Sequence, residues 1–169
     1  MDFALGMLVF VAALAGGQEP RDGGHVRTLD VRIRAEINEG MARSAFFRDL
    51  VTRLDASDVI VYVETECPMS PRLFGRLQFM ARGGGRRYLN VRVSCALNDD
   101  DQIAALGHEL RHAVEIADAP SVVDVASLGE LYRRIGFASH GVRKGTGFES
   151  RAAIESARRV WAELGRTAE

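Results

Sequence analysis

The chain has 169 residues, 47% of them hydrophobic, and a formal net charge of −1. This length and apolar content predict a single domain with a buried core and exclude a second domain of similar size. The 22 basic residues are balanced by 23 acidic ones, so the composition does not predict a partner among the nucleic acids.

The N-terminal segment has the features of an export signal. Residues 3–15 form an apolar run that is short for a membrane span. Ala13-Leu14-Ala15 then supplies the small-x-small pattern of a signal-peptidase site. Asp2 stands where a signal peptide usually carries a basic residue, and an uncleaved anchor or a core helix are the alternatives. We expect export to the cell envelope or the medium, with no stable membrane span in the mature chain.

Two helices are expected after a flexible linker. Apolar residues repeat every four positions from Leu29 to Met41, which indicates an amphipathic helix. Ser44 resembles an N-cap, and it precedes a second amphipathic pattern that ends at Leu54.

Three strands should follow. Residues 59–63 form a β-rich apolar run typical of a buried strand, and residues 73–79 alternate as a half-exposed strand does. Gly83-Gly84-Gly85 predicts a turn before a third strand over 89–93. Gly75, inside the second strand, marks a bulge or a close backbone approach.

The two cysteines follow the first and third of these strands. If the strands meander in chain order, Cys67 and Cys95 are separated by an intervening strand, about 9–10 Å, which is too far for a disulfide. If the third strand lies beside the first, a disulfide becomes possible. The sequence leaves both arrangements open.

The most informative stretch is His108-Glu109-Leu110-Arg111-His112, an H-E-x-x-H motif. Asn98 and the acidic residues 99–101 favour a helix start before it, and apolar residues recur at three- and four-residue steps through Ala117. On that helix His108 and His112 share one face, where two imidazoles can bind one Zn²⁺. Glu109 can then act as general base toward a water on the metal. Two surface histidines or a core pair are the simpler alternatives.

A third metal ligand is expected from outside the motif helix. Glu149 opens a second helical pattern after a glycine-rich loop, so we expect it in a first helical turn packed against the motif helix. His140, in the loop, is the rival. Glu115 lies about 10 Å along the helix from His108, so it should pair with a neighbour instead of binding the metal. His140 and Tyr132 are the candidates for oxyanion stabilisation.

The remaining elements continue the helical pattern. Ala119-Pro120 ends the motif helix, and Ser121 is expected to cap another helix over 122–135. Residues 137–147 read as a loop. The last helix carries an apolar stripe expected to pack in the core: Ile154, Ala157, Val160, Trp161 and Leu164.

His108-Glu109-x-x-His112 followed at a distance by Glu149 resembles the gluzincin zinc metallopeptidases, the group that includes thermolysin. The Asn-Glu-x-x-Ser-Asp signature of thermolysin-like enzymes is absent, which leaves the subgroup and the third ligand open. The resemblance implies an α+β, zincin-like fold. In that fold a small sheet, N-terminal helices and the H-E-x-x-H helix precede a C-terminal helix that carries the third ligand.

The resemblance also implies a function. It predicts a zinc-dependent peptidase in which His108, His112 and Glu149 bind Zn²⁺ and Glu109 is the general base, acting on a peptide or protein substrate. The alternative is a non-catalytic or degenerate zinc-binding domain with a structural or partner-binding role. The predicted segments are a signal peptide (1–17), a linker (18–27) and a zincin-like catalytic domain (28–169).

Overall fold

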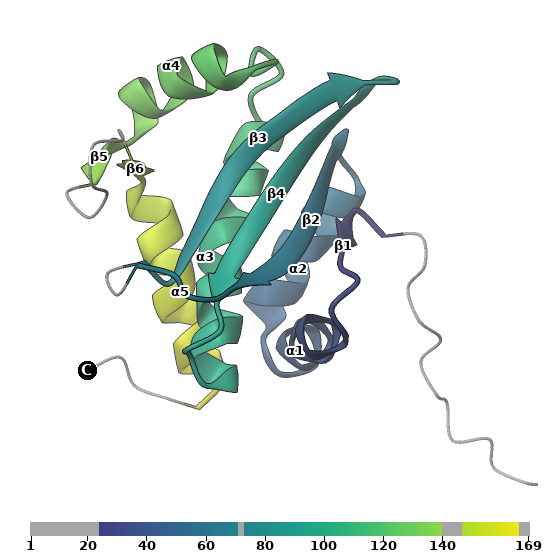
Figure 1. Ribbon diagram of the computed structural model, residues 1–169, viewed down its shortest axis with the longest axis vertical. Coiled ribbons are helices and arrows are strands. Elements are labelled where there is room, and N and C mark those ends of the chain that lie inside the picture. The colour runs from purple at the N-terminus through teal and green to yellow at the C-terminus, as the bar shows by residue number, and fades with distance from the viewer. Residues whose placement is uncertain (1–23, 71–72, 140–146, 166–169) are drawn as a thin grey trace, which may run out of the picture.

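The computed structural model describes residues 24–70, 73–139 and 147–165, and these form an α+β fold (Figure 1). The helices are α1 (Val31–Arg43), α2 (Ala45–Asp55), α3 (Asp99–Ala117), α4 (Val125–Ile135) and α5 (Arg151–Glu163). The strands are β1 (Val26–Arg27), β2 (Val59–Glu66), β3 (Gly75–Gly83), β4 (Arg86–Ser94), β5 (Phe137–Ser139) and β6 (Gly147–Glu149). The expected α+β class is therefore confirmed.

The main sheet has the strand order β1-β2-β4-β3. Strands β1 and β2, and β2 and β4, are parallel, whereas β3 and β4 form an antiparallel hairpin. The hairpin turns at Gly84 and Gly85, whose positive φ angles of 57° and 72° suit glycine, so the predicted turn is confirmed. In Figure 1 the sheet lies in front of α2 and α3, and β3 is the edge strand opposite β1.

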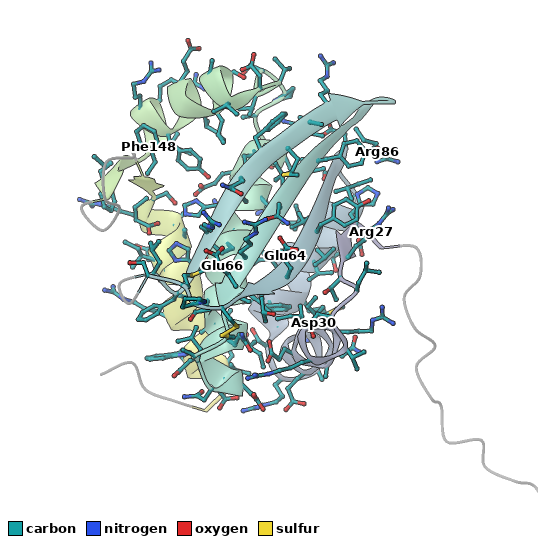
Figure 2. The ribbon with its side chains drawn as sticks, viewed as in Figure 1. Arg27, Asp30, Glu64, Glu66, Arg86 and Phe148 are labelled. Atoms are coloured by element: carbon teal, nitrogen blue, oxygen red, sulfur yellow. A yellow bond between two sulfur atoms is a disulfide. The ribbon has the colours of Figure 1, made fainter. Side chains whose placement is uncertain are left out.

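One face of the sheet is polar and the other is covered. Glu64 and Glu66, labelled in Figure 2, lie on the face turned away from α2 and α3. Arg92 and Arg76 form ion pairs with them across this face. The opposite face contributes buried β-branched and leucine side chains to the core, packed against the helices: Val59, Val61, Val63, Leu89, Val91 and Val93.

The strand order decides the disulfide that the sequence left open. Because β4 lies beside β2, Cys67 and Cys95 end neighbouring parallel strands, and their Cα atoms are 5.7 Å apart. They form a disulfide. The third predicted strand therefore lies beside the first, and a meander in chain order is wrong.

Side-chain caps set the helix starts, and two expected starts need correction. Ser44 caps α2 as predicted, accepting a hydrogen bond from the amide of Phe47. However, α1 begins only after Asp30, whose carboxylate caps it, so Leu29 is outside the helix and 97% exposed. Similarly, Asp124 rather than Ser121 caps α4, in a reciprocal capping box with Ser127.

The expected linker also ends earlier than predicted. Val26 and Arg27 extend the sheet as β1, paired in parallel with β2. The amide of His25 donates to Asp55, which fixes this segment against the end of α2. The folded domain thus includes residues 24–27. The expected signal peptide and the rest of the linker lie outside the described residues.

Arg87 anchors the motif helix at its C-terminal end. Its side chain is 3% exposed and forms a two-point ion pair with Asp58. It also donates to the carbonyls of Ile116, in the last turn of α3, and of Ala119, just beyond the helix. A charged hydrogen-bond donor here holds α3 against the sheet.

Among the described residues, no helix is both long enough and apolar enough to cross a membrane.

Glu36, on α1, makes stability depend on pH. Its side chain is 5% exposed, and Oε2 has no hydrogen-bond partner among the described residues. Burial raises its pKa to about 7, although Arg32, 3.0 Å from Oε1, acts in the opposite direction. Because the folded state binds the proton more tightly than the unfolded chain, stability falls as pH rises from about 4.5 to about 7.

We therefore expect Glu36→Gln to stabilise the protein at pH 8 by roughly 2–3 kcal/mol and to have little effect at pH 4. Chemical denaturation at the two pH values measures the difference. Glu39→Gln, on the same helix but in an exposed pair with Arg43, is the control and should change stability by less than about 1 kcal/mol. Equal effects of Glu36→Gln at pH 4 and pH 8 would contradict the assignment.

Candidate metal centre

The H-E-x-x-H segment lies within α3, as predicted. Asn98 caps the helix by accepting from the amide of Asp101, and the first turn is acidic, which complements the helix dipole. The four-residue spacing puts His108 and His112 on one face, with ring centroids 4.9 Å apart. The motif helix brings the two imidazoles together through local geometry alone.

Glu149 meets these two imidazoles. Its Oε1 lies 3.1 Å from Nε2 of His108 and 3.2 Å from Nε2 of His112. Zinc ligands at 2.0–2.2 Å from a tetrahedral ion are about 3.3–3.6 Å apart, so the observed separations are close to two edges of such a site. The three ligand atoms lie within 4.8 Å of one another. This donor set fits Zn²⁺.

The element that carries Glu149 differs from the prediction. Glu149 is the last residue of β6, paired with Phe137 of β5, and is not in the first turn of a helix. Ser150 is extended and caps α5, so the helix begins at Arg151. The C-terminal helix therefore does not carry this carboxylate, which lies two residues before it. β6 and the cap of α5 direct it toward α3.

The other two candidates for the third position have different outcomes. Glu115 does not join the cluster. Its Oε2 lies 3.0 Å from Nδ1 of His112, on the other side of the ring from Glu149. The expected pairing of Glu115 with a neighbour is confirmed. His140 lies outside the described residues.

The charges of the cluster are those of a cation site. Burial lowers the pKa of His112, but the hydrogen bonds to Glu115 and Glu149 outweigh it and raise this pKa to about 9. Burial raises the pKa of Glu149, but the two histidines outweigh it and bring this pKa down to about 2. The metal-free protein thus keeps a proton on His112 near neutral pH. A divalent cation between the imidazoles and Glu149 would replace that proton.

Glu109 lies beside the cluster on the next position of α3. The residue is 5% exposed. Burial raises the pKa of its carboxyl, against the opposing influence of His112 and His108. A carboxyl with a raised pKa is a better proton acceptor near neutral pH than an exposed one. Its position and environment suit acid–base chemistry.

Gly75 of β3 contacts this carboxyl directly. A Cβ added at Gly75 would lie 2.8 Å from Oε1 and 2.9 Å from Cγ of Glu109. Gly75 does not have a positive φ, so space and not backbone conformation requires glycine here. Of the two alternatives at Gly75, a bulge or a close backbone approach, the structure has the close approach, and β3 lies against the candidate base.

A cleft of about 890 Å³ opens in front of the cluster. His108, Glu109, His112 and Glu149 all line it. Most of its other walls are apolar. They come from β3 and the two residues before it, from the segment before α3, and from α4, β6 and α5: Leu73, Phe74, Leu77, Leu97, Val125, Leu128, Phe148, Ile154, Ala157 and Trp161. Phe148, labelled in Figure 2, stacks with Tyr132 of α4. These residues give the cleft a mainly apolar surface beside the cluster.

Sequence analysis missed part of this wall. Of the apolar stripe on α5, only Val160 and Leu164 are buried in the core, whereas Ile154, Ala157 and Trp161 line the cleft. The two groups occupy neighbouring faces of one helix. The stripe spans about 120° of the helix, an ordinary width for one core-facing surface, so the sequence held no signal for this division.

Tyr132 is close to the cluster in an unexpected orientation. Its hydroxyl lies 2.9 Å from Nδ1 of His112, the nitrogen that also contacts Glu115. It therefore approaches the side of the ring opposite Glu149. This geometry supports a role in orienting His112 and does not support the expected role of Tyr132 as an oxyanion stabiliser.

Comparison with known proteins adds no relative to this description. No family model, no curated protein and no solved structure matches the chain. The site is therefore described by its own residues: two imidazoles on one helix, a carboxylate from β6, a buried glutamate and an apolar cleft.

Proposed function

We propose that the protein is a zinc-dependent peptidase of the gluzincin type, with a zincin-like domain. The observation that carries this proposal is the convergence of His108, His112 and Glu149 on one point, beside Glu109 and at the wall of an open cleft. Two imidazoles and one carboxylate, with a fourth position left for water or substrate, form a common donor set of catalytic zinc.

The chain's own residues supply the acid–base chemistry. Zinc held by the three ligands would lower the pKa of a water to about 7 and polarise the substrate carbonyl. Glu109 accepts a proton from the attacking water as the water adds to the scissile carbonyl carbon. It then donates that proton to the leaving amine as the carbon–nitrogen bond breaks. Its buried position beside the histidines keeps this proton transfer within the cleft.

The edge strand offers a backbone surface for an extended peptide. The carbonyl of Phe74 accepts from the amide of Ser94, so Phe74 turns its backbone groups toward β4. Backbone groups alternate in direction along an antiparallel strand, which turns those of Gly75 and Leu77 toward the open edge. Both residues line the cleft, so a peptide added there as a strand would pass Glu109.

The cleft lining indicates what kind of peptide fits. Its walls are mainly aliphatic and aromatic, with Phe74 and Val125 63% and 69% exposed. Burying apolar substrate side chains against such surfaces is favourable. We therefore propose peptides or unfolded protein segments with apolar residues near the cleaved bond as substrates.

Gly75 provides a test of the geometry. We expect Gly75→Ala to reduce hydrolysis by about 100-fold, because the new Cβ must displace Glu109, and small misplacements of reacting groups have effects of this size. Zinc content should not change, since the three atoms nearest to the new Cβ all belong to Glu109, which is not one of the proposed ligands. Gly83→Ala, in the same strand but with open space around it, is the matched control. Peptide hydrolysis rates decide, and an unchanged rate for Gly75→Ala would contradict the position assigned to Glu109.

The competing proposal is a non-catalytic domain that keeps zinc for structure or partner binding. The buried Glu109 and the open cleft favour catalysis, because a structural site uses neither. The decisive experiment measures zinc content and cleavage of a mixed peptide library, before and after treatment with a chelator. Cleavage that chelation removes and zinc restores supports the peptidase. Stoichiometric zinc without cleavage supports the non-catalytic domain.

We further propose that the protein acts outside the cytoplasm. The Cys67–Cys95 disulfide supports this location, because disulfides persist mainly in oxidising compartments. The expected mature N-terminus then lies near Gly16 to Gln18. N-terminal sequencing of the protein from its native host measures it, and an intact Met1 on cytoplasmic protein would contradict the proposal.

A further inference from the structure

Glu115 contacts a different partner with each carboxylate oxygen. Its Oε2 accepts a hydrogen bond from Nδ1 of His112 over 3.0 Å, and its Oε1 accepts one from the Ser150 hydroxyl over 2.7 Å. The side chain is only 6% exposed. A buried carboxylate is costly unless its oxygens are paired, so both contacts are needed to keep it in this position.

Ser150 connects the same carboxylate to the third candidate ligand. Its amide donates to Oε1 of Glu149 over 2.8 Å, and this is the oxygen that faces both imidazoles. Its hydroxyl oxygen also accepts from the amide of Ala153, which caps α5. Ser150 therefore fixes Glu149 through its backbone and reaches α3 through its side chain.

We propose that Glu115 and Ser150 form a positioning pair for the metal centre, here called the Glu115–Ser150 pair. When Nδ1 of His112 donates to Glu115, the lone pair of Nε2 is left free to bind a metal. The hydrogen bond from Ser150 to Glu115 sets the start of α5, and with it Glu149, relative to His112. The carboxylate of Glu115 thus positions two ligands from separate elements, His112 of α3 and, through Ser150, Glu149 of β6. This inference rests on the proposed zinc site.

Burial alone does not explain the pair. Arg111, the arginine nearest to Glu115 in sequence, approaches Oε1 only to 3.8 Å, whereas His112 and Ser150 make the two short contacts. A carboxylate that served only to balance a charge could lie at the surface at lower cost. Its placement between a ring nitrogen and a helix cap instead fits the orientation of ligands.

The test measures zinc affinity in Glu115→Gln, Ser150→Ala and the double variant, by competition with a chromophoric chelator. Loss of a residue that orients a zinc ligand typically weakens affinity by about 10–100-fold, and we expect this for each single variant. Both changes disturb the hydrogen bond between Ser150 and Glu115. The fold-loss of zinc affinity in the double variant should therefore be smaller than the product of the two single fold-losses. Ser150→Thr keeps the hydroxyl and should restore near-normal affinity.

Ser156→Ala is the matched control. Like Ser150, Ser156 is a buried serine, but it lies within α5 and its hydroxyl donates to the carbonyl of Ala152 in the same helix. It should bind zinc as the wild type does. The absorption spectrum of the Co²⁺-substituted protein gives a second readout, because it reports ligand geometry directly. We expect it to change in Glu115→Gln and Ser150→Ala and not in Ser156→Ala.

The outcomes separate this inference from the proposed function. If the wild type binds zinc, and Glu115→Gln and Ser150→Ala match it in affinity and Co²⁺ spectrum, the pair is only structural and the inference is overturned. Lower thermal stability of the metal-free variants with unchanged zinc affinity has the same meaning. If the wild type itself fails to bind zinc, the proposed metal centre has failed, and with it the basis for the pair.

Discussion

Glu109→Gln is expected to lose peptide hydrolysis by about 10²–10⁴-fold while it keeps its zinc, because the amide cannot accept a proton from the attacking water. The side chain keeps its size, so it still fits against Gly75. Removal of a buried carboxylate whose pKa is raised should also stabilise the protein near neutral pH. Single-turnover hydrolysis rates and metal analysis of the same sample measure the loss of hydrolysis and the retention of zinc.

Glu155→Gln is the control for Glu109→Gln, since Glu155 is exposed on α5 and does not line the cleft. It should retain the wild-type rate. If Glu109→Gln loses zinc together with activity, Glu109 is a ligand or a structural residue, and its assignment as general base is wrong. If it keeps full activity, another group transfers the proton.

Glu149→Ala should have the second large effect, a loss of zinc affinity of more than about 100-fold. Loss of a residue that only orients a ligand lowers affinity by up to about 100-fold, so loss of a ligand should exceed this. The variant removes the carboxylate whose Oε1 contacts both Nε2 atoms. It also leaves a His112 ring whose raised pKa has lost one of its causes. Activity should disappear at zinc concentrations that saturate the wild type. Competition with a chelator measures the affinity.

Glu115→Ala is the control for the effect of Glu149→Ala on zinc affinity. Glu115 lies as close to His112 as Glu149 does, but on the other ring nitrogen. We expect it to keep most of its zinc at saturating concentration, in contrast to Glu149→Ala. His140→Ala should reduce turnover at most. In a zinc-bound structure the Glu149 carboxylate should lie within about 2.0–2.2 Å of the metal, and His140 or Glu115 in its place would refute the gluzincin assignment.

The sequence by itself determined the features that depend on near neighbours. The cap at Asn98 and the apolar period predicted α3, and a helix places residues four apart on one face, so the pairing of His108 with His112 followed without tertiary information. The triple-glycine turn was likewise readable, because it depends on the local backbone. A glycine inside a strand also indicated a bulge or a close approach at Gly75, but only the tertiary structure placed Glu109 against it. Glu149 was expected at the start of the last helix and lies two residues before it. The prediction came this close because the glycine-rich break before that helix is a local signal.

Only the tertiary structure decided how distant segments meet. Whether β4 pairs with β2 or only with β3 depends on which arrangement buries more apolar surface, and the resulting order brought Cys67 and Cys95 together. Glu149 ends a strand and does not start a helix, because pairing between β5 and β6 competes with helix propensity at that point. The α5 stripe divides between core and cleft because α3 covers only part of it, and the packing of one helix against another is not encoded in the period of either.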